Sequence, residues 1–389
     1  MLRLRIHICL VICLLFPHFL WAEGQTNQAV NPTDLQREDY ITASLLVATP
    51  TSDVYSLFGH TLLRLNCPSK QMDYCFSFET STETENLFNF LRGTAKGGYK
   101  AMKTDNLLEA YRQVGRGVVE YPLNLTPVEK ITLWKNVDER IAKGFVWQYG
   151  YMHTQCTSMI IDLVSQSLSA PIDYTSRGDI KGSFREHMLT ESEPFPWSAF
   201  FWQTIMGPEG DNTEPFEQTL SPRLLITAWQ QANVGDARRL IESQGSQLIA
   251  PAVYETPSPI TSPTWAFALF LIIILCVTFG QFHRDWQRIP LVVDILLIVL
   301  YTLFALFLTW LVLFSQQDGT QWNWYLVAFN PLPILLWVFC PKCRAAICRI
   351  LAFVFLALIA LTPLIHQLDL AHTAMMTPFA VRLAAYLKK

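Results

Sequence analysis

The feature that most constrains this 389-residue chain is a block of long apolar runs in its C-terminal third. After a proline-rich linker at 250–264, apolar residues dominate 265–389, with short polar loops between the runs. A run of about 18 or more apolar residues is long enough to cross the hydrocarbon core of a bilayer. We therefore expect a membrane protein in which the mixed-polarity stretch 23–249 forms one water-facing domain.

The lengths of the apolar runs predict four membrane spans and leave the tail open. The predicted spans cover 265–282, 290–314, 323–340 and 349–366. The tail at 371–387 carries His372 and Arg382 in a short apolar stretch, which fits either a fifth span or a helix on the membrane surface.

Two patterns predict the orientation. Basic residues follow the first and third spans, whereas 315–322 contains no Lys or Arg, so 315–322 is expected on the side opposite the cytoplasm. Residues 1–22 have the layout of a secretory signal, with Arg3 and Arg5 before an apolar core and Ala22 at its end. Cleavage after Ala22 and retention as an anchor both stay open. Either way, we expect a multi-pass protein of the bacterial inner membrane with the domain at 23–249 in the periplasm.

Charge and cysteine spacing argue against two classes of function. The net charge of −3, from 29 basic and 32 acidic residues, comes without a basic block, so a nucleic-acid partner is not expected. Cys340 and Cys343 form a C-x-x-C pair, but no second pair completes the four ligands of a typical zinc site. They are interpreted as thiols at the membrane edge, and neither a metal nor another cofactor is predicted.

The exported stretch holds three further cysteines. Cys67 and Cys75 flank a short turn, where an oxidising compartment permits a disulfide if the strand register allows it. Cys156 has no obvious cysteine partner. It is either a nucleophile or a buried small hydrophobe.

Local patterns predict the elements that carry these residues. Strands are predicted at 39–50, 59–66, 72–80 and 115–125, the second and third forming a hairpin. A helix starts where Thr126 is the cap, Pro127 takes the first position and Glu129 closes a capping box. Cys156 begins another amphipathic helix, whose positive end favours a thiolate. His60 opens the second strand.

Cys156 and His60 together supply the two groups used in thiol-based acyl transfer. Each alone has an ordinary structural alternative. His153 is closer in sequence to Cys156, but catalytic partners usually meet through the fold rather than along the chain.

Longer stretches resemble a known family. The runs YSLFGHTLLRL, RGVVEYPLNLTPVEKITL and YGYMHTQCTSMIIDL resemble the Lnb N-terminal periplasmic domain over about 38–235, and DGTQWNWYLVAFNPLPILLW resembles the family's membrane part. Characterised members are lipoprotein N-acyltransferases with a thiol nucleophile. The resemblance implies an α+β, papain-like domain of the permuted NlpC/P60 type, followed by an all-α membrane domain of four or five transmembrane helices.

The resemblance also implies roles for single residues. His60 would be the general base and Cys156 the nucleophile, while Tyr149 and Tyr151 would shape the substrate pocket. Gln155 stands where the family commonly has Asn, which leaves open whether its side chain serves oxyanion binding or loop geometry.

A third polar group is expected to orient His60. Strand facing makes Ser77 the first candidate, with Asp73 and Glu79 behind it. Arg64 lies on the same face as His60 and is interpreted either as a ligand for a substrate phosphate or as part of a salt bridge.

The expected function is lipoprotein N-acylation. A phospholipid would donate its acyl chain to Cys156, backbone N–H groups at the helix start would hold the oxyanion, and the amine of a diacylated lipoprotein would accept the chain. Two alternatives remain. The same Cys/His pair could serve a hydrolase acting on a peptide, an amide or a lipid ester, or the domain could be a membrane-anchored binding module without catalysis.

Overall fold

The computed structural model describes residues 41–53, 55–176, 181–213, 220–235, 238–251, 258–281 and 288–386. The predicted signal at 1–22 and part of the predicted linker lie outside these residues. The strands are β1 (Thr42–Ala48), β2 (His60–Cys67), β3 (Met72–Thr80), β4 (Lys96–Lys103), β5 (Val118–Pro122), β6 (Trp147–Gln148), β7 (Ile172–Asp173), β8 (Asn233–Val234), β9 (Arg238–Arg239) and β10 (Ser246–Ile249). The helices are α2 (Leu87–Arg92), α3 (Thr104–Gln113), α4 (Pro127–Lys143), α5 (Cys156–Ser165), α6 (Phe184–Glu191), α7 (Pro196–Ile205), α8 (Pro222–Gln231), α9 (Pro263–Gly280), α10 (Arg288–Phe314), α11 (Tyr325–Ala328), α12 (Leu332–Phe339), α13 (Arg344–Leu361) and α14 (Leu370–Tyr386).

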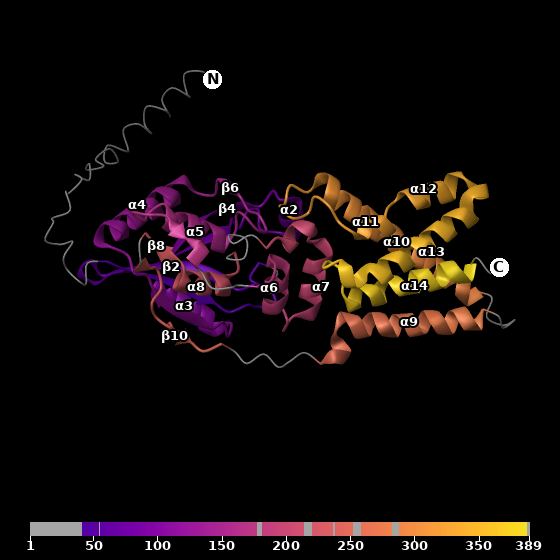
Figure 1. The fold of residues 1–389 in the computed structure, drawn as a ribbon, viewed down its shortest axis with the longest axis horizontal. Helices are drawn as coiled ribbons and strands as arrows, with labels where there is room; N and C mark the ends of the chain where they lie inside the picture. Colours follow the sequence, from indigo (N-terminus) through magenta and orange to yellow (C-terminus); the bar gives the residue numbers. More distant parts are fainter. Residues whose placement is uncertain are drawn as a thin grey trace, which may run out of the picture. The chain divides into compact units, whose positions relative to one another are not determined.

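An antiparallel sheet forms the frame of the N-terminal domain (Figure 1). Its seven strands run in the order β10-β5-β1-β2-β3-β4-β6, and β7, β8 and β9 form a smaller sheet. The predicted strands are confirmed as β1, β2, β3 and β5, with β2 and β3 paired as the predicted hairpin. A mixed α/β domain with a sheet therefore precedes the helical C-terminal part.

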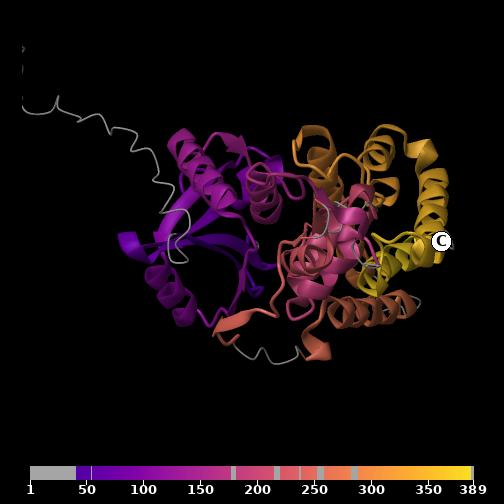
Figure 2. The same ribbon diagram turned by 60° about the vertical axis from the view of Figure 1, so that its left-hand side comes forward.

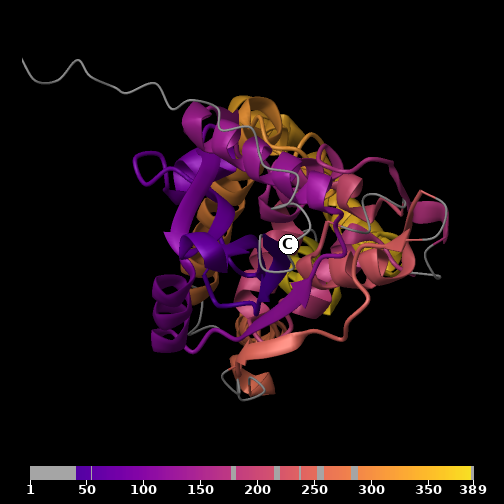
Figure 3. The ribbon, with the colours of Figure 1, turned by 90° about the vertical axis from the view of Figure 1, so that its left-hand side faces the viewer.

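The two faces of the sheet pack against different helices, as Figures 2 and 3 show from two sides. On one face, Leu63 and Phe76 join the main core with Ile160 of α5. On the other, Leu62 packs with Leu107 of α3. Successive strand residues point to opposite faces, so the alternation in the sequence decides which helix each side chain meets.

Local capping signals set the starts of α4 and α5. Thr126 and Glu129 form the predicted capping box, in which the Thr126 N–H donates to Glu129 and the Glu129 N–H donates to the Thr126 hydroxyl. The helix that the sequence predicts from Cys156 is confirmed as α5, whose inner face is buried. These short-range signals place the nucleophile candidate at a helix N-terminus.

The disulfide considered between Cys67 and Cys75 is not formed. Both are free thiols, and strand register explains why, because Cys67 pairs with Met72 whereas Cys75 pairs with Arg64. The Cys75 sulfur instead lies 3.3 Å from the hydroxyl of Thr104.

The C-terminal part is helical, with α9, α13 and α14 packed side by side (Figure 1). Among the described residues, three helical stretches are long and apolar enough to cross a membrane: Pro263–Gly280, Arg288–Phe314 and Pro341–Leu364. The span predicted at 323–340 is instead divided into the short helices α11 and α12. Pro331 and Pro333 lie at this break, and proline disrupts a continuous helix. The tail predicted at 371–387 forms α14, which has 17 residues.

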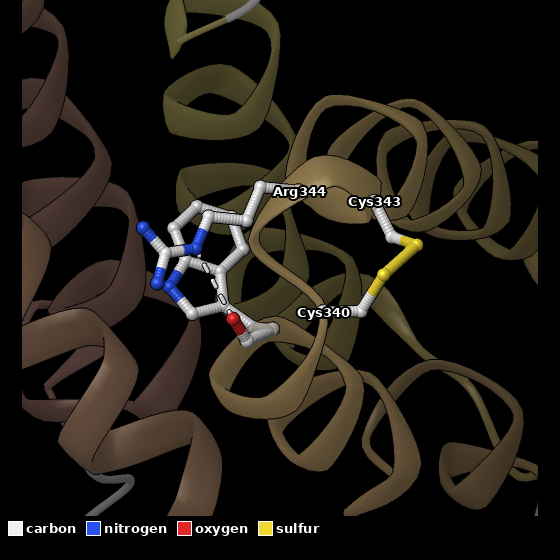
Figure 4. The surroundings of a disulfide bond; sticks show 4 residues. Cys340, Cys343 and Arg344 are labelled. Carbon is white, nitrogen blue, oxygen red and sulfur yellow. Dashed lines mark hydrogen bonds between the residues drawn. A yellow bond between two sulfur atoms is a disulfide. The ribbon is translucent and has the colours of Figure 1, made fainter.

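Cys340 and Cys343 are joined by a disulfide, whereas the sequence interpretation treated them as separate thiols (Figure 4). The turn between α12 and α13 brings their Cα atoms to 5.3 Å, within the range that a disulfide spans. Next to it, the guanidinium of Arg344 lies over the ring of Trp337 and donates to its carbonyl oxygen at 3.1 Å. The disulfide thus closes the turn between α12 and α13.

Candidate functional site

His60 lies at the first position of β2, directly after a tight turn. Gly59 has a φ of 87°, in the left-handed region that favours glycine, and a Cβ there would lie 2.8 Å from the carbonyl oxygen of Ala48. The turn therefore requires glycine, and it returns the chain so that His60 pairs with Ala48 of β1. The His60 side chain is buried at the end of the sheet.

Cys156 is the first residue of α5, and Gln155 caps that helix. The side-chain oxygen of Gln155 accepts the N–H of Thr157 at 2.8 Å and the Cys156 thiol at 3.4 Å. The amide nitrogen of Gln155 donates to the carbonyl oxygen of Leu220 at 2.8 Å. The roles left open for Gln155 were oxyanion binding and loop geometry. These contacts fix the geometry of the loop, and one of them uses the Thr157 N–H.

His60 and Cys156 meet at the end of the sheet, although they are far apart in the chain. His60 and the Thr61 N–H lie close enough to the Cys156 sulfur to favour its ionised form. The Thr61 and Thr157 hydroxyls also lie 3.0 Å apart and link β2 to α5. Burial acts to raise the pKa of the Cys156 thiol, but the charge of His60 and the polar groups of His60, Thr61 and Thr157 more than offset this effect. The pKa of Cys156 is therefore below its ordinary value, which favours the nucleophilic thiolate.

Glu79 on β3 supplies a carboxylate beside His60. His60 Nε2 lies 4.0 Å from Glu79 Oε1, to which the Ser77 hydroxyl donates, and Lys100 Nζ lies 3.0 Å from Glu79 Oε2. Burial acts to raise the pKa of Glu79, but the charge of His60, the bond from Ser77 and the pairing with Lys100 hold that pKa below its usual value. Ser77, the first candidate to orient His60, thus binds Glu79, and it is Glu79 that lies next to the ring.

Arg64 and Asp73 belong to a separate ion-pair cluster on the same hairpin. The Arg64 guanidinium binds the two Asp73 oxygens at 2.8 and 2.6 Å and both Glu120 oxygens at 3.0 Å. Asp73 also accepts the hydroxyl of Thr104 at 2.6 Å. Arg64 was considered either as a ligand for a substrate phosphate or as part of a salt bridge, and these contacts form a salt bridge. Asp73, a candidate to orient His60, binds Arg64 instead.

A small cavity lies beside Cys156. Its volume is about 40 Å³, room for about three water molecules if each needs roughly 10–15 Å³. Tyr149 and Tyr151, predicted to shape the pocket, both line it. Its aromatic wall comprises Tyr55, Phe58, Phe90, Tyr149, Tyr151, Phe184 and Trp202. Among the described residues, the lining contains no Lys, Arg, Asp or Glu, so the wall of this cavity is aromatic and uncharged.

A residue from the C-terminal part holds the loop that precedes Cys156. Asp318 lies between α10 and α11. Its Oδ1 accepts the N–H of Tyr151 at 2.6 Å, and its Oδ2 accepts the N–H groups of Met152 at 3.0 Å and His153 at 2.7 Å. Successive amides around one carboxylate form a strong, charge-assisted arrangement. Asp318 therefore fixes the backbone just before Cys156.

Further contacts come from residues 315–319, here called the docking segment. The buried Gln317 donates to the carbonyl oxygens of Phe90 at 2.6 Å and Tyr149 at 3.2 Å. The Gly319 N–H donates to Glu209, whose carboxylate also lies 3.4 Å from the exposed ring of His153. The docking segment thus joins the α2 region, the loop before Cys156 and the segment after α7.

Sequence reasoning missed several residues of this site. Trp202 lies on α7, in a stretch for which we predicted no element. Asp318 lies in the loop at 315–322, which has no Lys or Arg and is expected on the same side of the membrane as the exported domain. This expected side is the one sequence feature that brings Asp318 near the site. The loop pattern did not indicate which backbone groups the carboxylate would bind.

Comparisons with known proteins now bear on this arrangement. The chain matches the model of the Lnb N-terminal periplasmic domain over residues 31–184 and that of the Lnb transmembrane domain over residues 255–387. Comparison with curated proteins and with solved structures gives no match. Both His60 and Cys156 lie within the first matched range, and Asp318 lies within the second. The chain is a membrane protein with a periplasmic N-terminal domain and a transmembrane domain, and it belongs to the Lnb family.

Proposed function

We propose that this protein is a lipoprotein N-acyltransferase of the bacterial inner membrane. The observation that carries the proposal is the pairing of His60 with a buried Cys156 thiol of lowered pKa, beside an aromatic cavity. A thiolate next to a proton carrier is the arrangement used for covalent acyl transfer. Membership of a family with a periplasmic and a transmembrane domain supports a substrate in the membrane.

The first half of the reaction loads the enzyme. The Cys156 thiolate attacks the carbonyl carbon of a phospholipid ester, and a carbon–sulfur bond forms as the carbonyl electron pair moves onto oxygen. The pair then returns, the carbon–oxygen ester bond breaks, and the leaving alkoxide takes a proton from His60. The products are a Cys156 thioester and a lipid that has lost one acyl chain.

The second half transfers the chain. The α-amine of a diacylated lipoprotein attacks the thioester, and His60 accepts a proton from the nitrogen. The carbon–sulfur bond breaks, which restores the Cys156 thiolate and leaves an amide. In both halves the ionised Glu79 beside His60 stabilises the imidazolium.

The link between the two domains supports lipid substrates. The docking segment connects the loop before Cys156 to α10, one of the helices long enough to cross a membrane. A diacylated acceptor and a phospholipid donor keep their chains in the bilayer, so a reacting thiol held next to membrane helices suits both. A hydrolase for water-soluble peptides would have no need of such an attachment.

The proposal is tested by mass spectrometry of lipoprotein N-terminal peptides from cells with and without the protein. We expect N-acylated peptides with the wild type and free α-amines with Cys156→Ser, while both proteins accumulate equally in the membrane. Cys276→Ser, which removes an exposed thiol on α9, is the matched control and should keep full activity. Normal N-acylation with Cys156→Ser contradicts the proposal, and lipid hydrolysis without N-acylation would identify the hydrolase alternative.

A further inference from the structure

Three polar groups in the cavity wall have no hydrogen-bond partner in the described part of the chain. They are the hydroxyls of Tyr55 and Tyr151 and the indole N–H of Trp202. All three residues line the cavity that Cys156 lines. Tyr151 is 7% and Trp202 is 4% exposed, so bulk water does not readily satisfy them. Buried polar groups in folded proteins are nearly always paired, so three unpaired ones around one reactive thiol call for a ligand.

The three donors come from different elements and are fixed by one ring. Tyr55 precedes β2, Tyr151 precedes α5, and Trp202 lies on α7. Around Phe90, the ring centroids of Tyr55, Tyr151 and Trp202 lie at 4.8, 5.0 and 5.7 Å. The Tyr151 and Trp202 rings also meet edge to face at 4.7 Å. Packed rings hold their polar edges in place before any substrate arrives, which is the condition for electrostatic stabilisation of a transition state.

The chemistry of these groups selects a neutral acceptor. The indole N–H can only donate. Burial raises the pKa of Tyr55 to about 12 and that of Tyr151 above its ordinary value, so both hydroxyls keep their protons. The described residues of the cavity lining include no Lys or Arg to neutralise a phosphate, and the volume of about 40 Å³ suits a group the size of an ester rather than an acyl chain or a lipid headgroup.

The usual donors at a helix start are partly unavailable here. The Thr157 N–H already donates to the side-chain oxygen of Gln155 at 2.8 Å. The amide nitrogen of Gln155 donates to Leu220. An oxyanion formed on attack by Cys156 therefore cannot use the Thr157 N–H while that bond is in place, and the residues that carry the unpaired groups line the same cavity.

We propose that Tyr55, Tyr151 and Trp202 bind the oxygens of a neutral carboxylic ester and hold the charge that develops when Cys156 attacks its carbonyl carbon. As the carbon–sulfur bond forms, the carbonyl electron pair moves onto the oxygen that these groups contact. It returns when the ester carbon–oxygen bond breaks and His60 gives its proton to the leaving oxygen. This inference rests on the proposed function, because it assigns the donors to the acylation of Cys156.

The test measures acylation and alkylation of the same thiol in the purified full-length protein. Burst release of p-nitrophenolate from p-nitrophenyl butyrate reports attack on an ester, and iodoacetamide reports thiolate reactivity without a carbonyl oxyanion. Tyr55→Phe, Tyr151→Phe and Trp202→Phe remove a donor and keep an aromatic ring. We expect the burst rate to fall about 100-fold for Tyr151→Phe and Trp202→Phe, with alkylation unchanged. Tyr121→Phe, which alters a partly buried tyrosine that does not line the cavity, should change neither rate.

Each other outcome has a definite meaning. A wild-type burst that persists unchanged in all three variants overturns the inference and leaves the proposed function standing. A parallel loss of burst and alkylation assigns the side chains a structural role and also overturns the inference. A wild type that alkylates but shows no burst overturns the proposed function together with the inference. Inhibition of the wild-type burst by inorganic phosphate competing for the cavity would overturn the preference for a neutral ligand.

Discussion

His60 and His372 have similar polar neighbours and different surroundings. His60 lies beside the Glu79 carboxylate, and His372 Nδ1 lies 2.6 Å from Asp369 while its Nε2 lies 3.1 Å from the Thr204 hydroxyl. By residue type, Asp369, His372 and Thr204 resemble a catalytic triad of acid, histidine and hydroxyl more completely than the residues around His60 do. Yet His372 is fully buried, stacked on a phenylalanine ring of α7, and it does not line the cavity at the thiol.

The difference teaches what separates a candidate active site from a structural polar cluster. His60 lies next to the Cys156 thiol, which lines a cavity, whereas the bonds of His372 join α14 to α7. Reactive residue types and good geometry are therefore not sufficient, because the reacting atom must also be reachable. Substitutions in the two clusters should separate catalysis from stability, and the four predictions below run from the largest expected loss of activity to the smallest.

His60→Gln should lower ester acylation by about 100- to 10,000-fold, because it removes both the proton carrier and the charge next to the thiol. The pKa of Cys156 is lowered mainly by His60, so its loss should raise that pKa. The midpoint of iodoacetamide alkylation should then move to higher pH. At a fixed pH below this midpoint, the thiolate fraction should fall about tenfold for each pH unit by which the midpoint rises. An unchanged profile would show that His60 does not act on Cys156.

Glu79→Gln should lower acylation by about 10- to 100-fold, because it removes the negative charge that stabilises protonated His60. Ser77→Ala should have a smaller effect in the same direction, since Ser77 contacts Glu79 and not the ring. Burst kinetics for both variants, and for the double variant, provide the measurement. A larger loss for Ser77→Ala than for Glu79→Gln would restore Ser77 as the group that orients His60.

Asp318→Asn should lower acylation by about tenfold, because one amide oxygen cannot replace a carboxylate that accepts three N–H groups. Amide hydrogen exchange at residues 151–153 should become faster in this variant. Gln316→Ala changes an exposed side chain in the same docking segment and is the control. Faster exchange with unchanged acylation would mean that loop order is not needed for the reaction.

His372→Gln should leave the reactivity of Cys156 within about twofold while lowering the melting temperature, since it disrupts buried hydrogen bonds worth about 1–3 kcal/mol. Thermal unfolding in detergent and alkylation at one fixed pH provide the measurements. A loss of acylation at normal stability would place the second cluster in the catalytic machinery and remove the contrast with His60.

Local signals in the sequence were sufficient for the elements that carry the Cys/His pair. The capping box at Thr126, the helix start at Cys156 and the alternation after His60 each depend on residues within a few positions. Such short-range preferences survive folding because nothing in the tertiary structure opposes them. The pairing of β2 with β3 also followed from two alternating runs around a short turn.

The remaining features of the site depend on register or on long-range contacts. The hairpin register decides that Glu79 rather than Ser77 lies beside His60, and that Cys67 cannot face Cys75. Register depends on how many residues the turn uses, which the alternation does not specify. Asp318 is separated from its partners by more than 160 positions in the chain, so no local pattern could have indicated this contact.

The docking segment also determines when the loop before Cys156 can become ordered during biosynthesis. Translation proceeds from the N-terminus, so the loop before Cys156 is made long before residues 315–319. Its three amides have no carboxylate to bind until α10 has been synthesised and the loop after it has reached the same side of the membrane. Under the proposed function, the thiol becomes fully positioned only after membrane insertion, when the protein has reached the membrane that would supply its substrates.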